Sequence, residues 1–534
     1  MTDKAPSEGH STRAAEIISA ACLATDLGMG FPFEHGLHGT LMAMRLADMI
    51  GVDDETASQT YFAGLLMYSG CTTDADVASR IFAGSRTENL TPVQFGSAPQ
   101  AMMGVLRAIP SPGAPPHQRT YEIARRLVSA AGFPKPHFAA LCEVAEMMAK
   151  RLGLPPTVHG LFAYLTERWD GKGMLKRARE EQIPLSIRIV HVARDAAYQR
   201  LVGGDDHAVD VIRQRGGHAF DPAIADLFVE EAPNILAAAD PSGSAWEATL
   251  AVEPRPWLTL EGEAIDRALA AIGDFADLGS PHLSGHSRGV AELAAAAARI
   301  CGLDTAYVSL MRRAGFVHDV GRVAIDPRVW QKPAALTVDE WEQVRLHSYH
   351  GERVLLRSPL LASLAEVASA HHERLDGTGY HRGASAAALP PGARLLAAAD
   401  AFHAMREPRP HREALRSEEA AALLGEEARA GRQDSEMVAA VIEAAGQPAP
   451  PVVRPAGLTE REVEVVALLA RGLQTKQVAR RLRISIKTAD RHIQNAYRKI
   501  GVSTRAAATL FAMEHGLVSG RGSADPRARA GSSG

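Results

Sequence analysis

The sequence has 534 residues, 46% of them hydrophobic and 22% charged, a composition typical of soluble globular proteins rather than of disordered or membrane proteins. Its 58 Lys and Arg against 62 Asp and Glu give a formal net charge of −4, which excludes a chain that binds nucleic acid over its whole length by charge alone. At roughly 150 residues per domain, this length predicts three or four domains.

No apolar run approaches the roughly 20 residues that span a bilayer, and the segment from Met1 to Arg13 is polar. We therefore expect a cytoplasmic protein with no membrane contact. The cysteines are far apart and form no Cys-x-x-Cys pair, which favours buried free thiols over a zinc site or a disulfide framework. They are Cys22, Cys71, Cys142 and Cys301.

Composition divides the chain into three blocks, residues 13–240, 257–446 and 457–518. Residues 1–12 and 519–534 are polar and predict disorder, while the Pro-rich and Gly-rich stretches 241–256 and 447–456 predict linkers. Within the blocks, apolar residues recur at helical spacing, and no run alternates as a strand would. The sequence therefore predicts an all-α fold.

The first two blocks resemble each other. Residues 63–70 (AGLLMYSG) align with 314–321 (AGFVHDVG), and residues 167–173 (ERWDGKG) align with 373–379 (ERLDGTG). His35 and His286 precede the first pair of strings at equal distances, and Arg188 and Arg394 follow the second pair at equal distances. A register kept over this length predicts two copies of one helical domain.

The copies differ at their polar positions. The second copy has His318-Asp319, His371-His372 and Asp400, where the first has Met67-Tyr68, Leu165-Thr166 and Arg194. We therefore expect the first copy to fold without catalysing. Two roles are open for it: a regulatory or dimerising half, or a pocket that binds a ligand without cleaving it.

Imidazole and carboxylate side chains of the second copy form a candidate metal site, and this mixture of ligands suits Fe, Mn or Zn. Adjacent residues of a helix point about 100° apart, so each doublet can serve two neighbouring ions. Asp319 would bridge the ions, while His318 and either His371 or His372 would bind separate ions. Two ions about 3.5–4 Å apart lower the pKa of a bridging water and clamp a phosphoryl group. The candidate ligands are His286, His318, Asp319, His347, His371, His372 and Asp400.

Four other histidines of this block are expected to be partly exposed or hydrogen-bonded residues of no special role. They are His282, His350, His403 and His411.

The strings His318-Asp-Val-Gly321, His371-His-Glu-Arg-Leu-Asp-Gly-Thr-Gly-Tyr380 and Arg394 to Asp400, with His286, resemble the HD-GYP branch of the HD phosphohydrolases. That resemblance implies a helical bundle that hydrolyses cyclic di-GMP at a centre of two or three metals. It implies the seven ligands named above, with Fe or Mn favoured over Zn, Ni or Mg. Some members bind a third ion with a glutamate, but this sequence has His282 at that position, so two ions are expected.

The resemblance also implies residues that contact the substrate. Lys332 matches the family's phosphate-contacting lysine, Arg322 stands where the family has lysine, and His403 stands where it commonly has aspartate. Arginine and lysine side chains suit the phosphates of a dianionic substrate. The expected catalytic residues are Asp319, Lys332 and Arg322, and the expected substrate contacts are Lys332, Gly377, Gly379, Tyr380, Arg409 and Arg412.

The third block carries most of the basic character, with 11 Lys and Arg against 5 Asp and Glu between residues 457 and 518. Thr459-Glu-Arg-Glu462 predicts a capping box that opens a helix, Thr475 a second helix, and Ser485 the cap of a third that ends near Ile500. Two short helices joined by a tight turn predict a helix-turn-helix. The expected DNA contacts are Thr475, Lys476, Ser485, Lys487, Thr488, Arg491, His492, Asn495 and Lys499.

The strings Leu458-Thr-Glu-Arg-Glu-Val463, Ser485-Ile-Lys-Thr488 and His515-Gly-Leu517 resemble the LuxR-type DNA-binding domain. The resemblance implies four helices, the third of which reads DNA, and a dimeric protein. Arg483 stands where the family favours Gly in the turn, which strains the turn by about 1 kcal/mol if φ is positive there.

Together these patterns predict two HD-type helical bundles followed by a four-helix LuxR-type domain. The expected function is a homodimeric transcription regulator that binds promoter DNA and hydrolyses cyclic di-GMP or a related phosphodiester. The alternatives are a regulator that senses a nucleotide or metal without turnover, and two HD-like copies that form an inert scaffold without metal.

Overall fold

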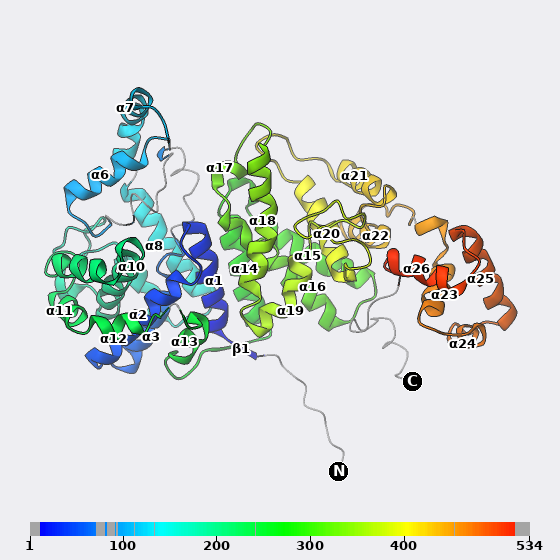
Figure 1. The fold of residues 1–534 in the computed structure, drawn as a ribbon, viewed down its shortest axis with the longest axis horizontal. Coiled ribbons are helices and arrows are strands. Elements are labelled where there is room, and N and C mark those ends of the chain that lie inside the picture. Colours follow the sequence, from blue (N-terminus) through cyan, green and yellow to red (C-terminus); the bar gives the residue numbers. More distant parts are fainter. Residues whose placement is uncertain are drawn as a thin grey trace, which may run out of the picture. The chain divides into compact units, whose positions relative to one another are not determined.

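The structure is a computed structural model that describes residues 11–70, 81–82, 91, 94–111, 113–132, 134–240, 242–452 and 454–517. Contacts divide the chain into two compact units, one of Met1–Ser284, Val320–Glu340 and Arg353–Ala362, the other of Gly285–Asp319, Trp341–Glu352 and Ser363–Gly534. Almost all regular structure is helical, which confirms the predicted all-α class (Figure 1). No helix of the described part is long and apolar enough to cross a membrane.

The first unit opens with a short strand. β1 (Ser11–Arg13) pairs antiparallel with β2 (Thr259–Glu261). The predicted disordered N-terminus thus differs from the structure at Ser11 and Thr12; its other residues, and the predicted tail 519–534, lie outside the described part.

The helices of the first unit carry the first copy, together with α14 and α17 of the second block. They are α1 (Ala14–Met29), α2 (His35–Ile50), α3 (Asp54–Leu66), α6 (Ala98–Ala108), α7 (Pro116–Gly132), α8 (Pro134–Arg151), α9 (Pro156–His159), α10 (Leu185–Arg215), α11 (Pro222–Glu230), α12 (Ala232–Ala237), α13 (Ala245–Ala251), α14 (Glu263–Asp277) and α17 (Pro327–Trp330). α2 packs against both α3 and α10 and forms the centre of this copy.

The predicted linker 241–256 is largely structured. It contains α13, where Trp246 is 5% exposed and the carbonyl of Thr249 accepts a hydrogen bond from Tyr61. The Pro and Gly residues that suggested a linker flank this helix, and its apolar side chains have partners in the core.

The second unit carries the second copy and the C-terminal helices. Its helices are α15 (His286–Ile300), α16 (Thr305–Val317), α20 (Pro391–Met405), α21 (Ser417–Arg429), α22 (Ser435–Ala444), α23 (Glu460–Ala470), α24 (Thr475–Arg481), α25 (Ile486–Ile500) and α26 (Arg505–Glu514), with most of α18 (Val338–Leu355) and α19 (Pro359–Ala368). α15 packs against α16, α20 and α22, as α2 does against α3 and α10.

The two copies repeat the same local contacts. Asp53 caps α3 and Asp304 caps α16, each by accepting a backbone N–H three residues on. Arg188 in α10 pairs with Asp221, the cap of α11, and Arg394 in α20 pairs with Asp434, the cap of α22. These repeated caps and ion pairs support the predicted duplication.

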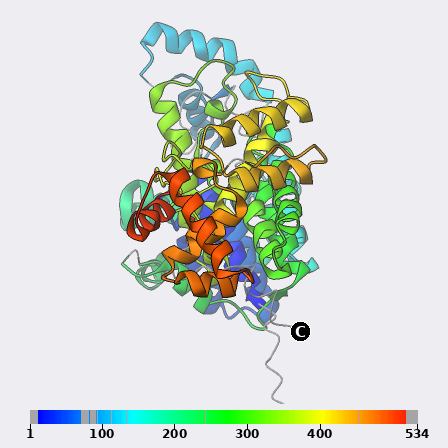
Figure 2. The same ribbon diagram turned by 90° about the vertical axis from the view of Figure 1, so that its right-hand side faces the viewer.

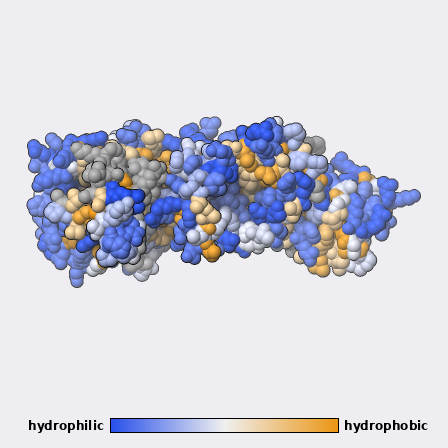
Figure 3. Space-filling model, turned by 90° about the horizontal axis from the view of Figure 1, so that it is seen from above, coloured by the Kyte–Doolittle hydropathy of each residue, from blue (hydrophilic) through white to orange (hydrophobic). Residues whose placement is uncertain are grey.

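The C-terminal helices α23 to α26, orange to red in Figure 2, form a small bundle around buried Val465, Val466, Val478 and Ile493. Thr459 and Glu462 form the predicted capping box, and Ser485 caps α25. The face of the molecule in Figure 3 is largely hydrophilic, with hydrophobic residues in scattered groups.

Candidate metal centre and DNA-binding face

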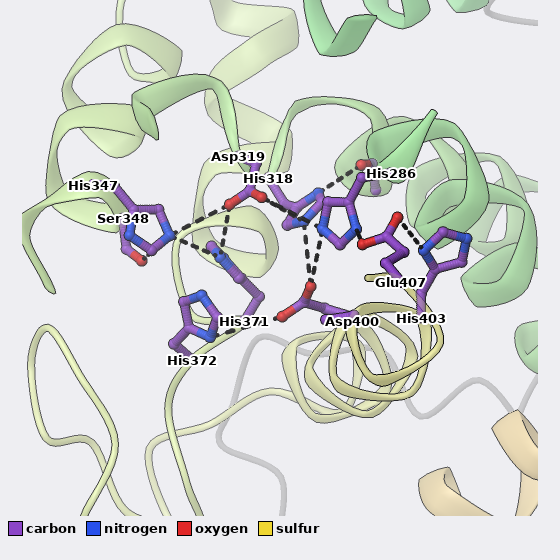
Figure 4. Close-up of polar contacts among 12 residues, drawn as sticks. His286, His318, Asp319, His347, Ser348, His371, His372, Asp400, His403 and Glu407 are labelled. Atoms are coloured by element: carbon purple, nitrogen blue, oxygen red, sulfur yellow. Dashed lines mark hydrogen bonds and ion pairs between the residues drawn. The ribbon is translucent and has the colours of Figure 1, made fainter. Parts of the chain in front are cut away.

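The candidate ligands of the second copy come from five helices or helix ends and converge in the second unit (Figure 4). His286 begins α15, His318 and Asp319 follow α16, His347 lies in α18, His371 and His372 follow α19, and Asp400 lies in α20. All are buried except His372, whose side chain is 28% exposed. The structure therefore brings together all seven side chains that the sequence singled out.

Asp319 faces a different pair of imidazoles with each of its oxygens. Oδ1 lies 3.3 Å from Nε2 of His347 and 3.4 Å from Nε2 of His371. Oδ2 lies 3.4 Å from Nε2 of His286 and 3.5 Å from Nε2 of His318. The carboxylate thus lies between two pairs of histidines, where a bridging ligand would lie.

Asp400 spans the same two sides. Its Oδ1 lies 3.2 Å from Nε2 of His286 and 3.7 Å from Nε2 of His318, and its Oδ2 lies 3.7 Å from Nδ1 of His372. Two groups of donor atoms are close enough to bind one cation each: His286, His318 and Asp400 on one side, and Asp319, His347, His371 and His372 on the other.

The rings of three of these histidines are held in the orientation that a metal ligand needs. Nδ1 of His318, His347 and His371 lies 2.7, 2.5 and 2.6 Å from the backbone carbonyl three residues earlier. Donation from Nδ1 fixes the tautomer and leaves the Nε2 lone pair toward the centre. The residues present therefore fit a pair of divalent cations.

Protons balance the carboxylates of the site. Burial disfavours the charged form of His286, but three neighbouring carboxylates outweigh burial and raise its pKa well above the usual value. Burial acts to raise the pKa of Asp400, yet the imidazoles of His286 and His318 hold it well below the usual value. Burial, followed by the charge of His371, lowers the pKa of His372. The carboxylate of Asp400 and the imidazole of His372 are thus in the states that cation binding requires, whereas a cation would displace a proton from His286.

The sequence prediction missed Glu407. Oε2 of Glu407 accepts a hydrogen bond from Nδ1 of His286 at 3.0 Å, and Oε1 lies 3.1 Å from Nδ1 of His403. His403 is partly exposed and paired with a carboxylate, in line with the expectation for it, and this carboxylate also contacts a candidate ligand. No motif marks Glu407, because it lies beyond the end of α20 and meets His286 only in the folded chain.

The loop after His372 is built by Glu373 and two glycines. The buried carboxylate of Glu373 accepts hydrogen bonds from the backbone N–H groups of Arg382 and Ala384. Gly377 has φ +77°, and a Cβ at Gly379 would overlap the backbone of residues 372–374. These glycines shape the loop. Their predicted contact with the substrate stays a prediction.

Tyr380 is the loop residue nearest the candidate ligands. Its ring centroid lies 4.7 Å from that of His372 and 6.1 Å from that of His347. The side chain thus lies beside the more exposed of the candidate ligands, where the expected substrate contact would place it.

The predicted phosphate-binding cations have protein partners. Nζ of Lys332 lies 2.6 Å from Glu340, and the guanidinium of Arg322 lies 4.0 Å from the ring centroid of Trp330. Arg409 pairs with Glu407 at 2.8 Å. Lys332, Arg322 and Arg409 stay predictions as substrate contacts.

The expectation for Arg412 needs correction. Its guanidinium donates to the backbone carbonyls of Ala404, Met405 and Glu407. These donors satisfy carbonyl groups that the C-terminus of α20 leaves free, so the residue caps a helix.

In the first copy, aromatic rings and a guanidinium replace the ligands. Tyr68 aligns with Asp319 and Arg194 with Asp400, and the Arg194 guanidinium lies 4.4 Å from the centroid of the Tyr68 ring. Burial lowers the pKa of His35, which aligns with His286, to about 3. At the aligned positions, which the structure describes, Tyr68 and Arg194 thus replace the two aspartates, and a first copy that folds without catalysing stays a prediction.

Most predicted DNA contacts lie at the surface of α24 and α25. Lys476, Lys487 and Arg491 are exposed, while Thr475, Thr488, His492 and Asn495 are partly exposed. Ser485 is exposed and accepts the N–H of Thr488 as the cap of α25. Arg483 has φ +54°, the strained conformation considered for the turn.

Lys499 has partners within the fold. Its Nζ lies 2.6 Å from the buried carboxylate of Glu462 and 3.0 Å from the carbonyl of Gly457. The ammonium joins α25 to the start of α23, and its contact with DNA stays a prediction.

Residues 271–437 match the HD domain family, and residues 456–512 match the bacterial regulatory proteins of the LuxR family. The chain combines an HD domain with a LuxR-family DNA-binding domain. The HD domain match covers all seven candidate ligands and Glu407.

Curated relatives share the HD domain. The chain is 26% identical over 418 residues to 3′3′-cGAMP-specific phosphodiesterase 3 of Vibrio cholerae, covering 77% of this chain and 90% of that protein. It is 37% identical over 137 residues to a cyclic di-GMP phosphodiesterase of Thermotoga maritima, covering 25% of this chain but only 37% of that protein. A response regulator of Xanthomonas campestris, the cyclic di-GMP phosphodiesterase RpfG, is 32% identical over 199 residues, which are 36% of this chain and 52% of that protein.

A solved structure has the same fold. The crystal structure of the cyclic GMP-AMP specific phosphodiesterase V-cGAP3 of V. cholerae aligns with a TM-score of 0.56 and 23% identity, over 82% of this chain and 98% of that chain. The HD-type fold therefore extends well beyond the residues that the family model matches.

Proposed function

We propose that the HD domain hydrolyses a phosphodiester bond of a cyclic dinucleotide with two divalent cations, and that the LuxR-family domain binds promoter DNA as part of a homodimer. The observation that carries the first part is Asp319, whose two oxygens each face a separate pair of buried imidazoles. The relatives named for cyclic di-GMP and cGAMP hydrolysis support the substrate class.

The side chains divide into two sets in this proposal. His286, His318 and Asp400 would hold one cation, and His347, His371 and His372 the other, with Asp319 shared. Bound cations of this kind lower the pKa of a coordinated water and neutralise charge on a phosphoryl group. Fe or Mn fits the mixture of imidazole and carboxylate donors.

The chain's own groups prepare the site. Backbone carbonyls three residues earlier accept from Nδ1 of His318, His347 and His371 and keep each ring in one tautomer, so that the metal-binding nitrogens need no rearrangement. The ring of Tyr380 lies beside the partly exposed His372, and in this position Tyr380 would contact the substrate.

The reaction would add water to phosphorus, break the bond to the leaving sugar oxygen, and end with a proton on that oxygen. Incubation of the protein, loaded with Mn²⁺ or Fe²⁺, with cyclic di-GMP and with 3′3′-cGAMP tests this directly. We expect a linear dinucleotide, and a loss of turnover of at least 10³-fold in His318→Ala and Asp319→Asn. His411→Ala, which removes an exposed histidine, is the matched control and should retain full activity.

The competing proposal is a sensor that binds the nucleotide without cleaving it. The departures at Arg322 and His403 favour it, because these residues stand where the family has lysine and aspartate. Tight nucleotide binding with no product at any metal loading would establish the sensor and contradict the hydrolase.

A further inference from the structure

One candidate ligand is oriented differently from the others. His318, His347 and His371 each place Nδ1 against the backbone carbonyl three residues earlier. His286 is the first residue of α15, and Gly285, with φ +84°, separates it from the short 3₁₀ helix Pro281–Leu283, so its Nδ1 does not continue a helical turn as the other three do. Its Nδ1 needs an acceptor from elsewhere in the chain.

Glu407 supplies that acceptor from beyond the end of α20. Oε2 accepts from Nδ1 of His286 at 3.0 Å, and the same oxygen lies 2.8 Å from the guanidinium of Arg409. The other oxygen, Oε1, lies 3.1 Å from Nδ1 of His403 (Figure 4). The His286 side chain is fully buried, so this carboxylate determines which of its nitrogens carries the proton.

Gly289 makes room for this arrangement. It lies one turn after His286 on α15, and a Cβ at this position would overlap the ring of His403. A glycine inside a helix lowers stability by about 1 kcal/mol relative to alanine. Alanine at this position would displace His403 and so disturb its contact with Glu407.

We propose that Glu407, held by His403 and Arg409, is a positioning residue that directs Nε2 of His286 toward the cation shared with His318 and Asp400. The proposal rests on the proposed metal-dependent function. An anionic acceptor raises the basicity of an imidazole more than a backbone carbonyl does, so this histidine would be the strongest imidazole donor of the site.

Donor distances would also allow His286, His403 and Glu407 to bind an ion of their own. The contacts oppose this. Nδ1 of His286 already donates to Glu407, and the Arg409 guanidinium brings a positive charge to the same oxygen that an ion would need. A carboxylate with an imidazole N–H and a guanidinium on one oxygen is satisfied by hydrogen bonds.

The test measures cation affinity rather than activity. Full-length protein is stripped of metal and titrated with Mn²⁺ and with Co²⁺, whose visible absorption reports the coordination of each site. We expect Glu407→Ala to weaken binding at one of two sites by 10- to 100-fold, and Glu407→Gln, which keeps an acceptor oxygen, by less than 10-fold. Glu419→Gln, which breaks an exposed ion pair with Arg416, is the matched control and should bind as the parent does.

A double-mutant cycle separates positioning from ligation. In the His286→Ala background, Glu407→Ala should have no further effect on cation affinity, because Glu407 then has no ring to orient. A further loss of affinity, or a stoichiometry that falls from three ions to two, would make Glu407 a ligand and overturn the proposal. The thermal midpoint of each metal-free variant shows whether it folds. If Glu407→Ala does not fold, the cation affinity of Glu407→Gln decides between a positioning role and a ligand.

Hydrolysis by the same preparations keeps the two proposals apart. If the parent cleaves a cyclic dinucleotide while Glu407→Ala binds cations normally, positioning by Glu407 is wrong and the hydrolase stands. If the parent binds cations in a manner that depends on Glu407 but cleaves nothing, the hydrolase is wrong and the positioning role stands.

Discussion

Each buried histidine of the HD domain has one ring nitrogen fixed by a hydrogen bond, and the other faces the shared carboxylates. Three of the acceptors are carbonyls three residues earlier in the same segment, so they follow from the local backbone around each histidine. The fourth acceptor, Glu407, is 121 residues away from His286 in the sequence. At the residue scale, the orientation of a ligand thus depends on contacts that a motif does not contain.

The contact between Gly289 and His403 gives a prediction at this scale. Gly289→Ala alone should displace the His403 ring, loosen Glu407 and weaken cation binding by about 10-fold. In the His403→Ala background the same substitution should be harmless to cation binding and should stabilise α15 by about 1 kcal/mol. Cation titration and thermal unfolding of the four proteins check this.

Gly425→Ala in α21 serves as the control for the helix effect, because a Cβ there meets only Pro450 at ordinary contact distance. It should stabilise the protein without changing cation affinity. A Gly289→Ala variant that binds cations as the parent does would contradict the packing argument.

At the element scale, α25 divides into a part that faces solvent and a part that holds the bundle together. Ala489, Ile493 and Ala496 are buried against the other helices, while Lys487 and Arg491 are exposed near the N-terminal half. Lys499 is in the last turn and binds the buried carboxylate of Glu462. Basic residues of one helix therefore have two separate roles.

This division predicts opposite phenotypes within α25. Lys487→Ala and Arg491→Ala should each weaken binding to a duplex selected from a random pool by about 1–3 kcal/mol if the side chain contacts a base. If it contacts a phosphate, the salt slope, which is the slope of log affinity against log salt concentration, should fall by about 1. Lys499→Ala should leave the salt slope unchanged and lower the thermal midpoint, because Glu462 loses its partner. Affinity measured over a series of salt concentrations, with thermal unfolding of each variant, checks both.

A salt slope that falls in Lys499→Ala as much as in Lys487→Ala would contradict the structural role of Lys499. Unchanged DNA affinity in both Lys487→Ala and Arg491→Ala would remove the proposed recognition face.

At the scale of the whole molecule, one fold occurs twice with opposite electrostatics at its centre. Both copies keep the capping aspartates, the buried loop glutamates Glu167 and Glu373, and the arginine that pairs with the next helix cap. Where the second copy gathers Asp319 and Asp400, the first places Arg194 on the ring of Tyr68. Clustered carboxylates need cations to offset their repulsion, whereas the aromatic cluster is complete without them.

Metal removal should therefore act on one copy only. Hydrogen exchange of the full-length protein, with and without a chelator, should show lost protection in peptides from α16 and α20. Peptides from α3 and α10 should keep theirs, because Arg194 and Tyr68 require no ion. Equal loss of protection in both copies would contradict this account.

The sequence by itself determined the helical class, the duplication, both domain types and the seven side chains that converge, because helical periodicity and motif spacing are local properties of the chain. It also identified the capping box, the cap at Ser485 and the strained turn at Arg483. Only the tertiary structure decided that Glu407 contacts both His286 and His403, that Lys499 and Arg412 have partners within the fold, and that a packed helix, Ala245–Ala251, lies in the predicted linker. Those contacts join segments from separate helices, and their partners are set by packing in three dimensions, which no spacing along the chain encodes.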